Sequence, residues 1–587
     1  MPLSLRTSNM VESMKDPETN SISVQEFSGE RREDEWSGRG WRRWKEWMRW
    51  FSKEGWKLRT DSASFATREG WSNSDVDVVP PEQRRWRELN YLFLWLSDGA
   101  NVGTMQQAGS IISLGLSWRE AAVAIAIGNI IIAVTTTLNG IIGAKHHIPF
   151  SIISRASMGF YFSYFAVLSR LALGLIYFGI NTYIGASCTL IMLESIWPSF
   201  KHFPNRLPTN AGVTSNKMTA YFLFWCLQFP LVLIHPRKMR WLFLIKSLFA
   251  ITASFALLGW CIHTAEGSAP IFSQDTTVKG SERSWAWVAG MNIAISGKTT
   301  LAINMPDLTR YARKPSDSYW QLLFIPLIYF SFSFIGILIA SSAQTIYHQL
   351  YWDPTSIISL LPSRSGSFFC AFAFGLATLG TNISTNSIAT SNDLAFLWPG
   401  YVNLRRGAFV TSLVGGWLTF PWKIQQSAKA LTTFLSGYIV VLAPILGIMI
   451  TDYWIVRKGK LHIPMLYSNQ GIYRYTYGIN FRALVTLSIV VPVNIPGLVN
   501  AIRPEVKVGI YDDLYKASWF LSFFIAIFIY LFISRIFPPT STFVSETVEE
   551  VDEPSVHSTD ICPVLPACTS NEKDEEDMKR DDMLNTD

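Results

Sequence analysis

Long apolar runs separated by short polar segments recur along the chain from about residue 89 to about residue 537. A membrane-spanning helix needs about 20 predominantly apolar residues, and we count twelve segments that reach or approach this length. They lie near residues 89–113, 119–142, 161–195, 219–235, 240–261, 285–305, 320–345, 368–392, 406–421, 430–455, 482–500 and 516–537. The pattern predicts an all-α integral membrane protein with about twelve transmembrane helices.

Two of these spans are interrupted near their middles by glycines and polar residues. The interrupting residues are Asp98, Gly99, Asn101 and Gly103 in the first span and Gly297 and Lys298 in the sixth. Glycine has no Cβ and departs easily from helical geometry, so we expect helix breaks at Gly99, Gly103 and Gly297. Two interrupted hydrophobic segments in corresponding positions of two halves are the best sequence indication of a secondary transporter's binding site. The pattern therefore favours a transporter.

The composition argues against several other functions. The chain has 587 residues, of which 49% are hydrophobic and 16% charged, and its net charge is +6. A moderate excess of Lys and Arg is ordinary for a membrane protein, so we expect no nucleic-acid partner. The six cysteines have neither zinc-ligand spacing nor the arrangement of a disulfide framework. No catalytic set of His, Cys or paired carboxylates lies in the spans, so we expect neither an enzyme nor a metal site.

The residues outside the spans form two polar tails. Residues 1–88 contain a Trp/Arg-rich segment, 36–58, in which tryptophans recur at helical spacing. This spacing is typical of an amphipathic helix on an anionic membrane surface; the alternative is a flexible tail with a chance cluster of tryptophans. Residues 538–587 are acidic, which predicts disorder. Lys573 and Lys579 in this tail are candidates for ubiquitination or trafficking factors, as any exposed lysine is.

The distribution of basic residues predicts the orientation. An even number of spans places both tails on one side of the bilayer, and the loops on that side are the more basic ones. Their basic residues include Lys145, Arg155, Arg237, Lys238, Arg310, Arg313, Lys314, Arg457 and Lys458. Cytoplasmic loops carry such an excess. We therefore expect a multi-pass protein of the plasma membrane with both termini in the cytoplasm.

Two charged residues lie deep within the interrupted spans. Lys298 is about ten residues from either end of its span, and ionisable residues at this depth are costly and functional by default. We expect Lys298 to face a cavity and to favour a ligand with carbonyl oxygens or a negative charge. Asp98 has two interpretations. It carries a coupled proton, or it caps the second half of its helix by accepting from the backbone N–H groups of residues 99–101.

The third and eighth spans carry amide side chains at helical spacing. Tyr177 and Asn181 are four residues apart, as are Asn382 and Asn386, so each pair lies on one helix face. Two amides suit bidentate recognition of an amide-like ligand. An aromatic ring beside an amide can stack on a flat heterocycle while the amide bonds to its edge. The alternative is that Tyr177 only packs against other helices, as most apolar and aromatic residues in protein interiors do.

Several short segments occur in a consistent order between residues 73 and 500. They are Asn101-Val-Gly-Thr104, Gly115-Leu-Ser-Trp118, Leu138-Asn-Gly140, Gly143-Ala-Lys145, Ile148-Pro-Phe150, Arg155-Ala-Ser157, Asn304-Met-Pro-Asp-Leu-Thr-Arg-Tyr-Ala312, Phe434-Leu-Ser-Gly-Tyr438 and Thr451-Asp-Tyr-Trp454. Together they resemble the nucleobase–cation symporter family 1, and within it the fungal uracil, allantoin and uridine permeases. The resemblance implies a LeuT-type fold: residues 89–261 and 285–455 are two inverted five-helix repeats, each with a discontinuous first helix, and residues 482–537 supply two accessory helices.

The resemblance also implies site residues. The family's substrate site falls on Tyr177, Asn181, Lys298 and Asn386, beside Asn382. The sodium site of bacterial relatives falls on Ser97, Ala100, Ala377, Gly380 and Thr381. Gly380 stands where the family has a hydroxyl-bearing residue, which weakens the case for sodium, and the fungal members look proton-coupled. The family has Trp and Gln where this chain has Tyr177 and Asn181, which leaves the substrate open.

These observations predict a secondary active transporter. We expect it to import a nucleobase or related heterocycle, of the uracil, allantoin or uridine class, by proton symport with alternating access. Its expected partners are that substrate and the lipid bilayer, and it needs no cofactor beyond the cotransported cation. The alternatives are a transporter of a vitamin, thiamine or nicotinamide riboside, on the same scaffold, and a nutrient receptor that does not transport.

Overall fold

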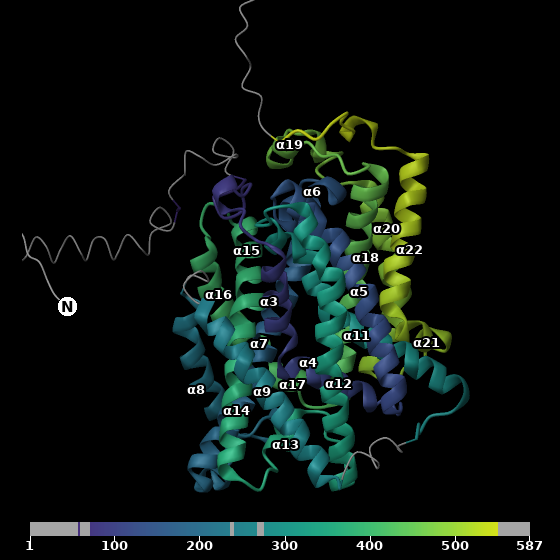
Figure 1. Cartoon of the computed structure of the whole chain (residues 1–587). Helices are drawn as coiled ribbons and strands as arrows, with labels where there is room; N and C mark the ends of the chain where they lie inside the picture. The colour runs from purple at the N-terminus through teal and green to yellow at the C-terminus, as the bar shows by residue number, and fades with distance from the viewer. Residues whose placement is uncertain (1–56, 59–70, 235–239, 267–274, 550–587) are drawn as a thin grey trace, which may run out of the picture.

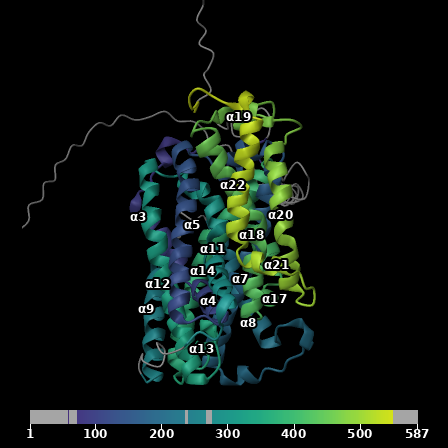
Figure 2. The same ribbon diagram turned by 90° about the vertical axis from the view of Figure 1, so that its right-hand side faces the viewer.

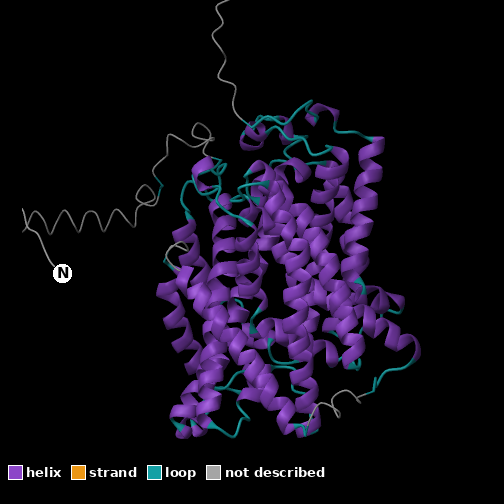
Figure 3. Ribbon diagram, viewed as in Figure 1, coloured by secondary structure: helices purple, strands orange, loops and turns teal. Residues whose placement is uncertain are grey.

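The computed structural model describes residues 57–58, 71–234, 240–266 and 275–549. Within these ranges the chain is helical, and the few β-bridges that occur are isolated (Figure 3). The predicted amphipathic segment 36–58, except for its last two residues, lies outside the described residues, as do residues 550–587 of the predicted acidic tail. Both stay predictions. The first part of that tail, residues 538–549, is ordered rather than disordered, because Thr540–Thr542 form a short 3-10 helix and the Val548 carbonyl accepts from the Ile463 N–H at 2.8 Å.

Twelve long helical units within the described ranges stand side by side in one bundle (Figures 1 and 2). They are α3–α4 (Glu88–Gly99, Val102–Ile112), α5 (Trp118–His146), α7 (Ser163–Ile196), α8 (Ser215–Val232), α9 (Arg240–Thr264), α11 (Gly280–Thr309), α12 (Gln321–Tyr347), α14–η6–α15 (Arg364–Thr381, Asn382–Ser387, Ile388–Leu397), α16 (Leu404–Trp417), α18 (Ala428–Thr451), α20 (Phe481–Ile502) and α22 (Ser518–Ile536). Shorter helices between them include α6 (Phe150–Met158), α13 (Pro354–Ile358), α17 (Pro421–Ile424), α19 (Ile463–Tyr467), the π-helical η7 (Asp452–Val456) and α21 (Ile510–Lys516). Each unit overlaps one of the predicted spans.

The outside of the bundle is apolar, as a lipid-facing surface must be. Eight helices of the described part are long and apolar enough, by length and composition, to cross a membrane. Large apolar side chains on them, such as Leu248, Phe369 and Phe528, are exposed. α3–α4 and α11 are not among the eight. They are the spans in which the sequence places polar residues at mid-depth, and they lie inside the bundle around the site described below.

One end of the bundle carries both described ends of the chain, and we call it the tail face (top of Figure 1). Residues 71–79 lie along this face, where the Asn73 amide donates to the Pro399 carbonyl at 3.1 Å. Residues 538–549 return to the same end, together with α6 and α19, whereas α13 lies at the opposite end. The tail face is therefore a layer of short segments that pack over the helix ends and are held there by hydrogen bonds.

The first span breaks where the glycines predict it. α3 ends at Gly99 and α4 begins at Val102. A Cβ on Gly99 would lie 2.6 Å from Ile328, so glycine also lets α12 pack against the break. The Asn101 side chain accepts a hydrogen bond from the Thr104 N–H at 2.9 Å and caps α4, as helix-starting Asn residues do. Asn101, rather than Asp98, therefore provides the cap.

The sixth span differs from the expectation of a break at Gly297. α11 runs uninterrupted from Gly280 to Thr309, which keeps its backbone groups paired inside the membrane. Gly297 serves close packing instead, because a Cβ there would lie 2.4 Å from the Gln107 side-chain nitrogen. Gly103 likewise lies in the first turn of α4, beyond the break itself. Of the three predicted helix breaks, the one at Gly99 is thus confirmed, and those at Gly103 and Gly297 are wrong.

Candidate functional site

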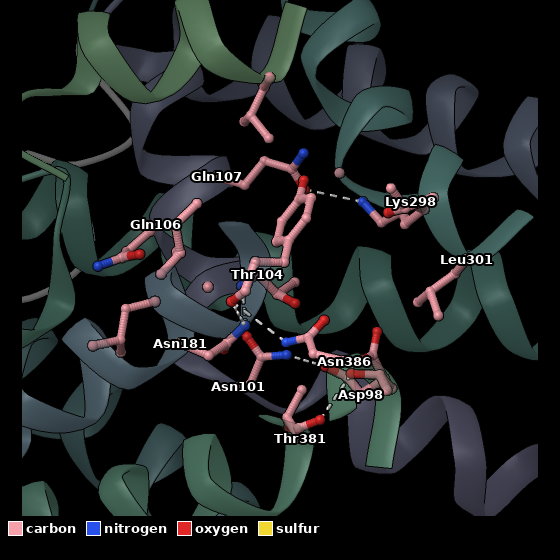
Figure 4. Close-up of a pocket in the computed structure, with 18 of the residues that line it drawn as sticks. Asp98, Asn101, Thr104, Gln106, Gln107, Asn181, Lys298, Leu301, Thr381 and Asn386 are labelled. Carbon is pink, nitrogen blue, oxygen red and sulfur yellow. Dashed lines mark hydrogen bonds between the residues drawn. The ribbon is translucent and has the colours of Figure 1, made fainter. Parts of the chain in front are cut away.

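A cavity of about 110 Å³ lies inside the bundle beside the break between α3 and α4 (Figure 4). It collects predicted site residues from α3, α4, α7, α11, α14 and η6. These are Asp98, Gly103, Tyr177, Asn181, Gly297, Lys298, Thr381 and Asn386. The unexpected members of its wall include Gln106, Gln107, Thr300, Tyr329, Thr385 and Gln425. Residues from both predicted repeats therefore meet in one polar cavity.

Lys298 projects from the middle of α11 into this wall and is 3% exposed. Its ammonium donates to the Ala294 carbonyl at 2.8 Å and to the Gln107 side-chain oxygen at 3.2 Å. It also lies 4.6 Å from the centre of the Tyr329 ring, which is within cation–π range. Figure 4 shows the bond to Gln107 across the cavity. Lys298 is thus held at the cavity by polar partners on α4, α11 and α12.

Tyr177 and Asn181 face the same cavity from α7, as their four-residue spacing predicts. The Tyr177 hydroxyl bonds to that of Tyr438 on α18 at 2.8 Å, which orients its ring. The Asn181 amide nitrogen donates to the Tyr177 carbonyl at 3.1 Å. Its side-chain oxygen accepts no hydrogen bond from any described residue, so it is available to a ligand.

Of the two asparagines in the eighth span, only Asn386 lines the cavity. Its amide nitrogen donates to the Asn382 oxygen at 2.9 Å, and its own oxygen accepts no hydrogen bond within the described part of the chain. Asn382 is fully buried behind it and donates to the Phe178 carbonyl and to Gln228, both at 3.0 Å. Asn382 therefore positions Asn386, and the expectation of two ligand-facing amides is corrected to one.

The place expected for a cation is filled by a lysine that is not among the predicted site residues. Lys246, on α9, is buried, and its ammonium donates to the Ser97 carbonyl and to the Thr381 hydroxyl, both at 2.8 Å. The Thr381 hydroxyl also donates to the Ser97 carbonyl at 3.2 Å. Two of the predicted cation-site residues thus meet around an ammonium that belongs to the protein itself.

Gly380 makes room for this lysine. A Cβ at Gly380 would lie 2.4 Å from Cδ of Lys246, far inside a normal contact, so the aliphatic stem crosses α14 at the glycine. The hydroxyl-bearing residue that the family places here would collide with it. The other predicted members are also buried: Ala100 directly follows α3, and Ala377 lies on α14. The glycine at position 380, where the family has a hydroxyl-bearing residue, is therefore what allows Lys246 to enter the site.

Asp98, the last residue but one of α3, completes the charged set. The Tyr329 hydroxyl donates to its carboxylate, and Lys246 and Lys298 both interact with it electrostatically. The site therefore brings two lysine side chains and one aspartate together inside the bundle, with a formal charge of +1 when all three are ionised. Charges in such a low-dielectric interior interact strongly.

The sequence carried a signal for the missed Lys246. It lies within the predicted fifth span, 240–261, and a charged residue inside a membrane span is a candidate functional residue in its own right. Its position near one end of that span resembled a residue that reaches the surface. Gln107 and Tyr329 carried no such signal, because amides and tyrosines are common in membrane helices as packing residues.

Comparison with known proteins gives the family. A family model described as permeases for cytosine/purines, uracil, thiamine and allantoin matches residues 78–522. An uncharacterised permease of Schizosaccharomyces pombe is 36% identical over 483 residues, 81% of this chain and 86% of that protein. The allantoin permease of Saccharomyces cerevisiae is 32% identical over 453 residues, 74% of this chain and 71% of that one.

A solved structure gives the fold. Mhp1, a nucleobase–cation-symport-1 family transporter in a closed conformation with bromovinylhydantoin bound, matches with a TM-score of 0.63 at 19% identity, over 80% of this chain and 97% of that chain. The predicted all-α, LeuT-type membrane fold is thereby confirmed. With most of its length matched by the family model and by the yeast permeases, the chain belongs to the nucleobase–cation symporter family 1, whose members are transporters coupled to a cation.

Proposed function

We propose that the protein imports a small nitrogen heterocycle of the uracil, allantoin or uridine class by proton symport. One observation carries the proposal. The cavity surrounds a space of about 110 Å³ with the ring of Tyr177, the free amide oxygens of Asn181 and Asn386, and the ammonium of Lys298. Uracil and allantoin stand in the description of the family model, and an allantoin permease is among the relatives.

The free groups favour a ring that carries N–H donors beside carbonyl acceptors. The Asn181 and Asn386 oxygens accept from N–H groups, and the Lys298 ammonium donates to a carbonyl. The Tyr177 ring offers a flat surface for stacking. A cavity well below the ~300–1,000 Å³ of drug-sized pockets suits a single ring. A hydrocarbon ring would leave the amides unpaired, at about 1–3 kcal/mol for each buried group.

Lys246 supports the proton as the coupled ion. A sodium ion between Ser97 and Thr381 would share its oxygen ligands with an ammonium already there, and like charges at this separation repel. We assign proton exchange to Asp98 together with Lys246. A protonated Lys246 ties α3 to α14 beside the cavity, so the proton and the substrate favour the same closed arrangement. By linkage, each then improves the binding of the other.

The transport cycle follows from the fold. In the proposed organisation, residues 89–261 and 285–455 are the two repeats and residues 482–537 the accessory helices. Rocking of one helix group against the other opens the cavity alternately to the two faces. The tail face carries the more basic loops, as cytoplasmic faces of membrane proteins do. This supports the proposal that the tail face and both termini are cytoplasmic. In the proposed orientation the substrate enters at the opposite face of the plasma membrane.

The test is uptake of radiolabelled uracil, uridine and allantoin in permease-deficient cells, with unlabelled thiamine as a competitor. We expect one heterocycle to accumulate faster at pH 5 than at pH 8. Lys298→Ala should abolish this uptake, and Lys429→Ala, an exposed lysine on α18, should leave it unchanged. Binding without accumulation would instead indicate a receptor.

A vitamin transporter is the second candidate, because the family description includes thiamine. The two candidates differ in the size and charge of the ligand. Competition by thiamine, with no accumulation of the three heterocycles in cells that display the protein at their surface, would favour the vitamin.

A further inference from the structure

A second cavity, of about 420 Å³, lies at the tail face where α20 begins and α22 ends. Its wall consists of the loop that precedes α20 and the segment that follows α22. The polar lining residues on which the argument rests are Arg474, Tyr475, Thr476, Arg482, Thr540 and Ser541. We call this the tail-face cavity. It is separate from the central site, and no step of the proposed transport cycle uses it.

The tail-face cavity is basic. None of its thirteen lining residues is acidic, and two are arginines. The Arg474 guanidinium is exposed and has no hydrogen-bond or ion-pair partner among the described residues. Arg482 is 6% exposed; its Nε donates to the Phe537 carbonyl at 2.6 Å and its Nη1 to Asn480 at 3.2 Å. Its Nη2 group bonds to no described residue. A buried guanidinium with free N–H donors favours an anionic occupant.

Hydroxyl groups add further donors to the wall. The side chains of Thr476, Thr540 and Ser541 have no hydrogen-bond partner within the described ranges. A phosphate group has several acceptor oxygens, and forked guanidinium donors together with hydroxyls match them in number and geometry. A carbohydrate or a peptide carboxylate would use fewer of these donors.

The cavity opens beside lipid-facing side chains. Phe481, the first residue of α20, is 42% exposed, and Phe537, next after α22, is 56% exposed. Their rings meet edge to face with centroids 6.0 Å apart. The start of α20 and the end of α22, where these two residues stand in the sequence, lie at the top of the bundle in Figure 2. A ligand with a phosphate head and apolar chains can place the head among the arginines and the chains along these helices. Basic pockets between transmembrane helices on the cytoplasmic side bind such head groups.

We propose that the tail-face cavity binds the phosphorylated head group of an anionic phospholipid. The choice of leaflet rests on the proposed orientation, which turns the tail face toward the leaflet rich in anionic lipids. An occupant would also strengthen the tail face. The Tyr475 hydroxyl in the cavity wall donates to the Ala156 carbonyl at 2.7 Å and accepts from Arg457 at 2.5 Å, and Arg457 pairs with the buried Asp452 at 2.6 Å. Lipid binding should therefore stabilise the junction of α6 and η7, the short helix that continues α18.

The test is the thermal stability of the full-length protein, purified in neutral detergent. Short-chain phosphatidylinositol 4-phosphate is titrated in, with short-chain phosphatidylcholine and inorganic phosphate as parallel probes. We expect the phosphoinositide alone to raise Tm, saturably, by about 2–4 °C. The rise should be absent in Arg474→Gln, which removes an exposed and unpaired side chain, and present in Arg474→Lys at a higher lipid concentration. Arg503→Gln, at the other end of α20, is the matched control and should respond as the unaltered protein does.

Each other outcome overturns the proposal. An equal rise with phosphatidylcholine would mean that the effect is not anionic, and an equal rise with inorganic phosphate would mean that the ligand is a free phosphate. An unchanged response in Arg474→Gln would place the lipid elsewhere. Because the measurement requires no transport, its failure is distinguishable from failure of the proposed transport function.

Discussion

Replacement of Lys246 by methionine changes the proposed coupling site while keeping an unbranched side chain of similar length. The substitution removes the ammonium's bonds to the Ser97 carbonyl and the Thr381 hydroxyl, both 2.8 Å long. Hydrogen bonds to charged groups contribute about 1.5–3 kcal/mol each, so the pair contributes about 3–6 kcal/mol. The cost of burying the ammonium offsets part of this. If about half of the hydrogen-bond energy remains after this cost, Lys246→Met destabilises the closed state by about 1.5–3 kcal/mol. Its population relative to the open states then falls about 10- to 100-fold.

The assay is the initial rate of substrate uptake at pH 5 and pH 8, with and without sodium, in cells with equal amounts of protein at the surface. We expect Lys246→Met to lose acid stimulation and to be about 10- to 100-fold slower at pH 5. Lys429→Met is the control, because Lys429 is exposed and is not among the residues that line the cavity, and it should behave as the unaltered protein. A Lys246→Met protein with a normal rate and normal acid stimulation would refute the assignment of proton coupling to this lysine.

Three further substitutions test the site and its support. Gly380→Ser should abolish transport, because the new Cβ would lie 2.4 Å from Cδ of Lys246 and collide with it. Gly400→Ser is the control and should be active, since Gly400 has open space around it; equal uptake by the two variants would contradict the packing argument. Asn386→Ala should raise KM about tenfold, because it removes one hydrogen-bond acceptor for the ligand. Asn382→Ala should mainly lower Tm, because Asn382 supports Asn386 from behind. A lower Tm with an unchanged KM in Asn386→Ala would show that Asn386 is structural and does not bind the ligand. Asp393→Asn should lower the free energy of unfolding by about 3 kcal/mol, the lower end of the cost of breaking a buried ion pair. It removes the ion-pair partner of the buried Arg170 on α7, while Asp307 still interacts with Arg170; an unchanged thermal unfolding curve would show that the pair is dispensable.

The helical framework was predictable because membrane insertion leaves few choices. Backbone groups in lipid must be paired within the segment, so an apolar run of sufficient length forms a helix. The polar interruption at residues 98–103 likewise predicted the break between α3 and α4, since the bilayer tolerates irregular backbone only where it lines a cavity. The same reasoning located Lys298, whose charge requires a polar interior.

The details of the site depend on tertiary contacts, which the spacing of residues along the sequence does not reveal. Four-residue spacing placed Asn382 and Asn386 on one face, yet only tertiary packing against α7 decides which of them reaches the cavity. Gly297 was expected to interrupt its helix, but its role is set by the Gln107 side chain that rests on it. The link between Gly380 and Lys246 joins residues on α14 and α9, and neither residue alone reveals the other.

The most direct test of the central claim is a proton flux driven by the substrate. The purified protein is reconstituted in sodium-free liposomes that contain a pH-sensitive dye, and the heterocycle that cells accumulate is added outside. Proton symport predicts acidification of the interior that begins with substrate addition, saturates with substrate concentration and is absent in Lys246→Met. Substrate entry without acidification, or entry only after sodium is added, would contradict the account.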